Sequence, residues 1–231
     1  MDNLSKAKQL IQTADVVVQN CKKDVAECLG VGYEQVRQRK PDIIYASLNT
    51  YGQLGSWASR PGYEQIAQAA TGMQERFGGD GQPSTQPFAV NDYGTGFMGA
   101  YGVALALLHR HRTGHGQHLD TALAYTACTL QSRFLQHYAG KHWEETRGQS
   151  ALGTGHLNRA YEAMDGLVFI AGRNHDLSAL ATIEGFAGID ELSNDELAHF
   201  LKQHLKGYTV SQWVYRLTPV GIGAHHVPPC Y

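Results

Sequence analysis

The chain has 231 residues, of which 42% are hydrophobic, and a formal net charge of −2. This length supports one or two domains with a buried core, and the hydrophobic content argues against disorder. The charge excludes the basic footprint of a nucleic-acid-binding protein, and no apolar run approaches the roughly 20 residues of a membrane span. The opening residues lack the pattern of a secretory signal, and the four cysteines form no CxxC pair. We therefore expect a cytoplasmic protein with reduced thiols.

The first fifty residues predict a βαβ unit. Apolar residues recur at helical spacing over 4–14, and the β-branched run 15–20 is typical of a buried parallel strand. Residues 33–39 are helical in pattern, and 42–48 form a second strand. This order is typical of a Rossmann-like sheet, in which ligands bind beyond the carboxyl ends of the strands. Here those ends are the loops 20–23 and 49–52.

The next ninety residues alternate helices with turns and a strand. Residues 63–74 are helical in pattern, and 78–83 carry three glycines and a proline, which are typical of turns. A helix is predicted from about Thr95 to His111, and its many small residues indicate a closely packed, buried helix. A strand at 117–120 and a helix at 121–139 follow.

The composition changes near residue 140. We place a linker at 141–158, with Gly153-Thr154-Gly155 as a turn, between a large domain at 1–140 and a small domain at 159–231. Asp165-Gly166 between two apolar runs predicts a hairpin over 161–171. Helical patterns follow at 176–185, 194–205 and 210–217. The predicted fold is α/β, with a partial Rossmann-like parallel sheet domain plus a smaller α+β domain.

Five segments together resemble the class III CoA-transferase family, which includes formyl-CoA transferase, carnitine CoA-transferases and α-methylacyl-CoA racemase. The most specific is His109–Gln117, which is similar to the family's Leu-Leu-x-Arg-x-x-Thr-Gly-x-Gly-Gln signature. The others, in matching order and spacing, are 14–20, 41–47, 60–63 and 91–96. The resemblance extends over residues 7–225 and weakens after 150.

Family members are longer at both ends, so the resemblance implies a truncated chain with an incomplete large domain. It also implies a homodimer, because family members form interlocked dimers in which each chain threads the ring of the other. Absent terminal strands would leave a sheet edge exposed. We therefore expect low solubility or dependence on a partner.

The resemblance places Asp92 at the family's catalytic carboxylate. In the transferases this group attacks an acyl-CoA thioester, and an aspartyl-CoA thioester then passes CoA to an incoming carboxylic acid. The helix expected to follow favours an ionised carboxylate at its start, and Gly94 and Gly96 leave room for a thioester. Without the resemblance, the ordinary interpretation of Asp92 is a helix N-cap.

The resemblance also admits a racemase. Racemases of the family use a histidine where Tyr63 stands and a glutamate near Asn174. Proton exchange at an α-carbon needs groups that titrate near working pH, and tyrosine and asparagine do not. We therefore expect CoA transfer from an acyl-CoA to a small carboxylic acid, with the racemase and a non-catalytic truncated subunit as alternatives.

The ligand implied by the resemblance is a coenzyme A thioester, which enters as a substrate, and no tightly bound cofactor is expected. The family's aromatic and basic CoA positions are Cys21 and Cys28 here, and the neighbouring lysines are substitute phosphate partners or simply a solvated pair. The histidines of 109–118 match no metal motif, so no metal site is predicted. The candidate CoA-binding residues are Asn20, Cys21, Lys22, Lys23, Asn49 and Tyr51.

Overall fold

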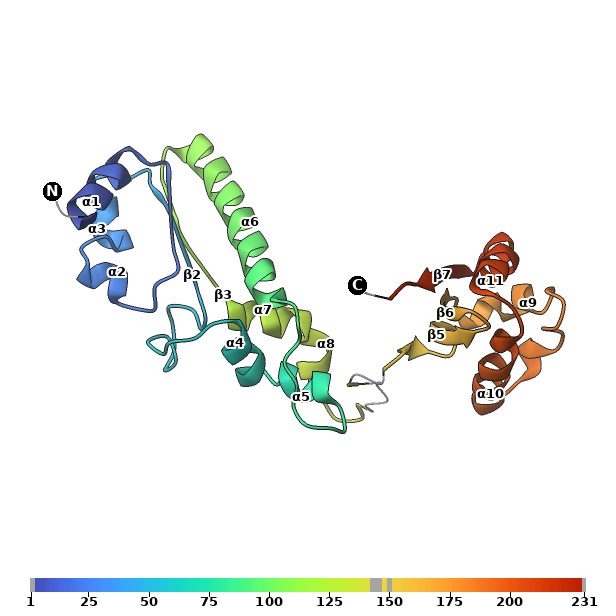
Figure 1. Ribbon diagram of the computed structural model, residues 1–231. Coiled ribbons are helices and arrows are strands. Elements are labelled where there is room, and N and C mark those ends of the chain that lie inside the picture. The colour runs from blue at the N-terminus through green and yellow to red at the C-terminus, as the bar shows by residue number, and fades with distance from the viewer. Residues whose placement is uncertain (1–2, 142–146, 149–150, 230–231) are drawn as a thin grey trace. The chain divides into compact units, whose positions relative to one another are not determined.

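The computed structural model describes residues 3–141, 147–148 and 151–229. The chain divides into two compact units, Met1–His142 and Trp143–Tyr231 (Figure 1). Residues 142–146 and 149–150 of the predicted linker lie outside the described residues. Within the described ranges, no helix is long and apolar enough to cross a membrane.

The first unit alternates helices with three strands. In chain order its elements are α1 Asn3–Thr13, β1 Val16–Gln19, α2 Val25–Cys28, α3 Tyr33–Arg37, β2 Ile44–Asn49, α4 Glu64–Ala70, α5 Met73–Gly78, α6 Val90–Thr113, β3 His118–Ala122, α7 Leu123–Leu130 and α8 Ser132–Leu135. The single helix predicted over 121–139 is two short helices, α7 and α8, which end at Leu135. It starts later than predicted because Thr121 and Ala122 pair with β2 as the end of β3.

The three strands form a parallel sheet in the order β1-β2-β3. Tyr45 of β2 lies opposite Val17 of β1 on one side and His118 of β3 on the other. As the central strand, β2 is almost entirely buried, which explains its continuous apolar run. The predicted α/β fold with a parallel sheet is confirmed.

Helix α6 packs against one face of this sheet (Figure 1). A methyl group added to Gly99 would lie 2.7 Å from Leu48 Cδ2, so glycine permits the close approach. The predicted close packing therefore holds, but only for one side of the helix. On the side of α6 that faces away from the Gly99 contact, a row of large side chains is exposed. We call this row the α6 stripe, and its members are Tyr93, Phe97, Tyr101 and Leu108.

A small core covers the other face of the sheet. Its buried members are Val36, Ile43 and Tyr45, and Tyr33 packs against them. The Tyr45 hydroxyl donates a hydrogen bond of 2.9 Å to the carbonyl of Val31, which ties the sheet to the chain before α3.

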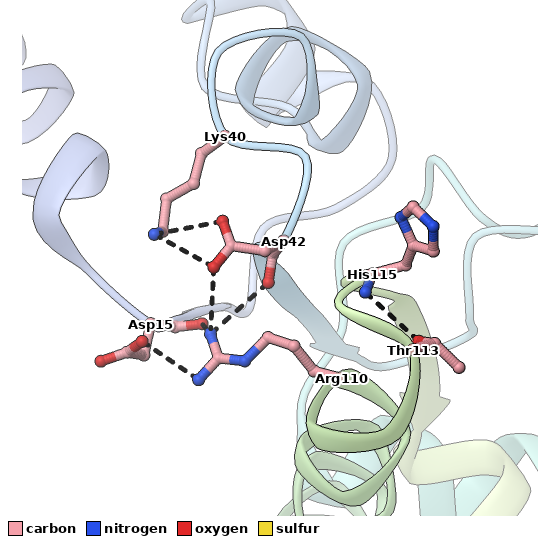
Figure 2. A network of polar contacts seen from close by, with 6 residues as sticks. All are labelled: Asp15, Lys40, Asp42, Arg110, Thr113 and His115. Carbon is pink, nitrogen blue, oxygen red and sulfur yellow. Dashed lines mark hydrogen bonds and ion pairs between the residues drawn. The ribbon is translucent and has the colours of Figure 1, made fainter.

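The signature run His109–Gln117 turns the chain from α6 into β3. Arg110 Nη2 lies 3.1 Å from Asp15 Oδ1, and Arg110 Nη1 lies 3.8 Å from Asp42 Oδ2 (Figure 2). Because these aspartates precede β1 and β2, one guanidinium joins the starts of two strands to the end of α6. Gly114 ends α6 with a φ of 76°, which glycine adopts without strain. This part of the signature is structural.

The second unit is built on an antiparallel sheet with helices. Its elements are β4 Gly153–Gly155, β5 Asn158–Ala163, β6 Gly166–Ala171, α9 Leu177–Leu180, α10 Asn194–His204, α11 Val210–Leu217 and β7 Gly223–Val227, with 3₁₀ turns at Asn174–Asp176, Ile189–Glu191, Leu205–Gly207 and Thr218–Val220. The strand order is β4-β5-β6-β7.

The predicted hairpin forms β5 and β6, with its turn one residue earlier than expected. Ala163 pairs with Gly166, so Met164 and Asp165 make the loop. The predicted turn at Gly153–Gly155 is wrong, because this segment pairs with β5 as a strand. A methyl group at Gly153 would run into the backbone of Asn158, so glycine lets this strand approach its neighbour.

Trp213 lies at the centre of the second unit's core and is fully buried. Its ring meets Phe186 and Tyr208 edge-on, with centroids 5.7 and 5.1 Å away. Its Nε1–H donates a 2.7 Å hydrogen bond to the carbonyl of Leu205. Helices α10 and α11 confirm two of the predicted helices, and α9 is shorter than the predicted range 176–185.

Candidate active site

The loops that follow β1 and β2 touch each other at the carboxyl edge of the parallel sheet. Asn49 Nδ2 donates a 3.5 Å hydrogen bond to the carbonyl of Cys21, and the Cys21 N–H donates a 2.6 Å bond to Gln19 Oε1. The turn at Cys21 is thereby held at both its N–H and its carbonyl. The structure thus brings together Cys21 and Asn49, two of the predicted CoA-binding residues.

The loop 49–53 is fixed at three points. Asn49 Oδ1 accepts a 2.6 Å hydrogen bond from the N–H of Gly52, and Asp120 Oδ2 accepts one of 3.0 Å from the N–H of Gln53. The carbonyl of Thr50 accepts a 3.0 Å bond from the N–H of Ala124 at the start of α7. Both polar atoms of the Asn49 side chain are engaged in this scaffold, so Asn49 shapes the loop.

Lysine and aromatic side chains surround these two loops. Asn20, Lys22 and Lys23 are exposed, and the N–H of Lys23 donates a 3.2 Å hydrogen bond to the carbonyl of Ala58. The half-buried Tyr51 meets Trp57 edge-on, with ring centroids 5.4 Å apart. The predicted residues of loops 20–23 and 49–52 therefore lie on neighbouring segments.

Asp92 lies in the first turn of α6, three residues after the N-cap Ala89. The helix begins at Val90, so the prediction of a start near Thr95 is wrong, and Asp92 is not the N-cap. Ala89 has no side chain that can cap the helix. The cap comes from Glu64 of α4, whose Oε2 accepts a 2.8 Å hydrogen bond from the N–H of Asp92.

Glu64 is a buried carboxylate that the sequence analysis did not single out. It is 3% exposed, and its Oε1 accepts hydrogen bonds of 2.8 Å from Asn91 Nδ2 and 2.7 Å from Gln68 Nε2. Both carboxylate oxygens of Glu64 are thus engaged by donors, Oε1 by two side chains and Oε2 by the Asp92 backbone. The available signal was its place beside the matching run 60–63, four residues before an equally polar and buried Gln68.

The Asp92 carboxylate itself is exposed and unengaged. In the part of the chain that the structure describes, it accepts no hydrogen bond and joins no ion pair. Partial burial raises the pKa of the Asp92 carboxyl above its ordinary value, and the negative charge of Glu64 raises it further. Glu64 therefore fixes the Asp92 backbone while leaving the side chain available to a ligand.

The two glycines after Asp92 have different surroundings. A methyl group at Gly94 would lie 2.5 Å from Thr126 Cγ2 of α7, whereas one at Gly96 would meet nothing within 4 Å. The hydroxyls of Thr95 and Thr126 lie 2.7 Å apart and hold the same two helices together. Gly94 is thus required by helix packing, and Gly96 alone leaves open space.

The described residues hold no hydrogen bond or ion pair between Asp92 and the loops 20–23 and 49–53. Nor does any group of three or more His, Cys, Asp or Glu within the described ranges lie close enough together to hold a metal ion. The site consists of one unengaged carboxylate at a helix start and two fixed loops at the ends of parallel strands.

Comparison with known proteins assigns the family. The sequence model of CoA-transferase family III matches residues 3–229. The chain is 34% identical to a succinate–glutarate CoA-transferase of Agrobacterium fabrum, covering 82% of this chain and 47% of that protein. It is 35% identical to a succinyl-CoA:mesaconate CoA-transferase of Haloarcula hispanica, covering 70% of this chain and 42% of that protein. The chain thus spans about half the length of the curated relatives it matches, or less.

Solved structures agree with this assignment. The Rv3272 protein of Mycobacterium tuberculosis superposes with a TM-score of 0.82 at 27% identity, covering 99% of this chain and 65% of that one. A CAIB/BAIF family protein from Brucella suis gives a TM-score of 0.74 at 25% identity, covering 98% of this chain and 63% of that one. The chain belongs to CoA-transferase family III.

Proposed function

We propose that the protein moves CoA from an acyl-CoA donor to a small carboxylic acid, with Asp92 as the nucleophile. The observation that carries this proposal is the unengaged Asp92 carboxylate, whose backbone is fixed by Glu64 through the 2.8 Å hydrogen bond. A nucleophile needs a free lone pair and a fixed position, and this arrangement supplies both.

The proposed reaction proceeds through covalent intermediates on Asp92. A carboxylate oxygen attacks the thioester carbonyl and the C–S bond breaks. CoA is released as a thiolate, and the acyl group remains on Asp92 as a mixed anhydride. The thiolate then attacks the aspartyl carbonyl, which releases the donor acid and leaves an aspartyl-CoA thioester. The acceptor carboxylate attacks this thioester and expels the thiolate, which then attacks the acceptor's acyl carbonyl. The new acyl-CoA departs and the Asp92 carboxylate is restored.

The start of α6 supports the charge changes in these steps. The N-terminal end of the helix dipole favours developing negative charge, and it acts here with the N–H groups of Val90 and Asp92 already engaged by Phe88 and Glu64. Glu64 opposes the charge of the ionised Asp92, and this repulsion falls when Asp92 is acylated. The raised pKa of Asp92 means that acid removes the nucleophilic form at a higher pH than for an ordinary aspartate.

The candidate CoA site is the pair of loops at the ends of β1 and β2. We propose that Lys22 and Lys23, both exposed, contact CoA phosphates, and that Asn20, Cys21 and Tyr51 contact the rest of the ligand. Asn49 acts by holding the Cys21 turn through its 3.5 Å hydrogen bond.

We also propose that the protein pairs as a homodimer, as the family resemblance implies. The exposed α6 stripe supports burial against further protein, because large apolar side chains rarely gather on a free surface. Light scattering after size-exclusion chromatography distinguishes one copy from two by mass.

The test uses succinyl-CoA with glutarate, because relatives are named for these acids. Hydroxylamine attacks the aspartyl-CoA thioester and releases CoA, so mass spectrometry of the Asp92 peptide should reveal a hydroxamate adduct on Asp92. Asp92→Asn should lower turnover at least about 10³-fold and abolish the adduct, since the nucleophile is lost. Asp195→Asn, which alters an exposed aspartate in the first turn of α10, is the matched control and should remain active.

Two results would contradict the proposal. One is the absence of any adduct with every donor tried while a full-length relative forms one under the same conditions, which supports a non-catalytic subunit. The other is deuterium exchange at the α-carbon of an acyl-CoA without CoA transfer, which supports the racemase.

A further inference from the structure

A chain of side-chain hydrogen bonds crosses the parallel sheet and ends at the Cys21 turn. His118 Nε2 of β3 lies 2.9 Å from Ser47 Oγ of β2, and Gln19 Nε2 of β1 lies 2.8 Å from the same oxygen. Gln19 Oε1 then accepts the 2.6 Å bond from the Cys21 N–H. Three adjacent strands therefore each supply one side chain, and Ser47, the central one, is 1% exposed.

The donors in this chain can be assigned from its end. A backbone N–H only donates, so the Gln19 atom that faces Cys21 is the carbonyl oxygen and the other Gln19 atom is the amide donor. Ser47 Oγ therefore accepts from Gln19. Because Ser47 is buried and the described residues offer its hydroxyl no other acceptor, we assign its hydrogen to His118 Nε2. His118 accepts only when it is neutral with its proton on Nδ1. Each bond in the chain then has one donor and one acceptor.

Groups from four elements face the His118 ring. Tyr33 of α3 stacks on it with centroids 4.9 Å apart, and Tyr45 of β2 meets it edge-on at 5.6 Å. The carboxylates of Asp120 on β3, Glu27 on α2 and Glu34 on α3 raise the pKa of His118, but burial outweighs them and the pKa falls below its ordinary value. These surroundings favour the neutral ring that the hydrogen bonds require.

The end of the chain matters because it fixes the backbone of a candidate ligand turn. Gln19 holds the N–H of Cys21, while Asn49 holds its carbonyl. Without its partner His118, the Ser47 hydroxyl turns away from the bond that Gln19 donates to it. The Gln19 amide is then free to rotate, and the Cys21 N–H loses a fixed acceptor. The orientation of this turn thus depends on a histidine two strands away.

We propose that His118 and Ser47 are positioning residues, which act through Gln19 to hold the Cys21 turn in the conformation that receives CoA. The proposal rests on the proposed function for its ligand, but not for the existence of the hydrogen-bonded chain. Its consequence for catalysis is a change in acyl-CoA affinity with little change in turnover, because neither residue touches the reacting atoms at Asp92.

The test compares two replacements of one side chain in the full protein. His118→Phe keeps a ring to stack on Tyr33 and removes the acceptor, whereas His118→Gln removes the ring and keeps an acceptor at the matching atom. Nitrogen-15 NMR of the wild type should show His118 neutral with Nε2 unprotonated. The Cys21 amide signal should move in His118→Phe and stay in place in His118→Gln.

Calorimetric titration with free CoA tests the functional part. The dissociation constant should rise about five- to tenfold in His118→Phe, the size expected for one lost hydrogen bond, and stay within about twofold in His118→Gln. Fixed Cys21 signals in His118→Phe would overturn the hydrogen-bonded chain, and moved signals with unchanged CoA affinity would overturn its positioning role. If the wild type fails to bind CoA, the proposed function is wrong. The NMR comparison still decides whether the hydrogen bonds from His118 to Cys21 exist.

Discussion

The two units of the molecule differ in the interactions that stabilise each of them internally. In the second, the described residues form a single cluster of fourteen buried apolar residues that includes Trp213. In the described residues of the first, the corresponding cluster has three buried members, and Phe97 of the α6 stripe is 76% exposed. Polar contacts link its elements instead, through Glu64 at the start of α6 and Arg110 at its end.

This difference separates stability from chemistry. A packed apolar core is not readily adapted to bind a charged ligand, whereas buried carboxylates and engaged loops orient groups at a surface. The candidate site lies wholly in the unit with the smaller apolar cluster. The two units should therefore respond differently to loss of an apolar side chain and to loss of a polar one.

The largest stability effect is expected at Trp213. Trp213→Ala should destabilise the second unit by about 3–5 kcal/mol, because it leaves a cavity and an unpaired Leu205 carbonyl. Hydrogen exchange mass spectrometry, read separately on peptides of each unit, measures the effect. Leu10→Ala removes an exposed side chain of the first unit outside the α6 stripe and should change stability by less than about 0.5 kcal/mol. Equal losses from the two variants would erase the contrast.

A smaller effect is expected at Glu64. Glu64→Ala should destabilise the first unit by about 2–3 kcal/mol, because the donors of Gln68, Asn91 and Asp92 lose their acceptor. Glu34→Ala is the control, since the Glu34–Arg37 pair is exposed and contributes little. Chemical denaturation followed by tryptophan fluorescence, with exchange to locate the change, provides the measurement. A loss at Glu64 no larger than at Glu34 would refute its capping role.

Arg110 tests the opposite end of α6. Arg110→Met keeps much of the side-chain volume and removes the contacts with Asp15 and Asp42, so a loss of about 1 kcal/mol is expected in the first unit. The difference from wild type should shrink in high salt, because added ions screen a partly exposed pair. Thermal melting at low and high salt checks both statements, and a salt-independent loss would indicate packing alone.

The smallest effect concerns pH. Because folding lowers the pKa of His118, the folded protein binds fewer protons than the unfolded chain below the ordinary histidine pKa. Stability of the first unit should therefore fall as pH drops below about 6.5, and the loss should level off below the folded pKa. His118→Gln should flatten this part of the pH–stability curve. An unchanged slope in that variant would assign the titration to another group.

Local patterns predicted the elements whose information lies within a few residues. The Val16–Val18 run and the buried β2 run gave the parallel strands, and Asp165-Gly166 gave the hairpin to within one residue. The prediction of where α6 starts was wrong, because Gly94 and Gly96 lower helix propensity locally and the cap comes from Glu64, which is distant in sequence. Strand β4 was not predicted, because its glycine-rich segment carries no alternation of polar and apolar residues.

The candidate site divides in the same way. The family resemblance identified Asp92 as a candidate, and the ends of the predicted strands identified the two loops, so both were predictable from the sequence. Glu64 escaped notice because an acidic residue at a helix start is ordinary, and only burial of its carboxylate against α6 distinguishes it. The series of hydrogen bonds from His118 to Cys21 was not predicted, because it depends on the register of three strands.

Helix α6 joins Asp92 near one end to Arg110 near the other without a break from Val90 to Thr113. Its twenty-four residues make a helix about 36 Å long, and an ion pair joins its C-terminal end to Asp15, at the start of β1. Adding one residue between these two side chains would turn Asp92 by about 100° about the axis relative to Arg110. The direction in which the proposed nucleophile points is thus set by the number of residues between it and Arg110, so an insertion there changes the direction even where a substitution on the exposed side of the helix does not.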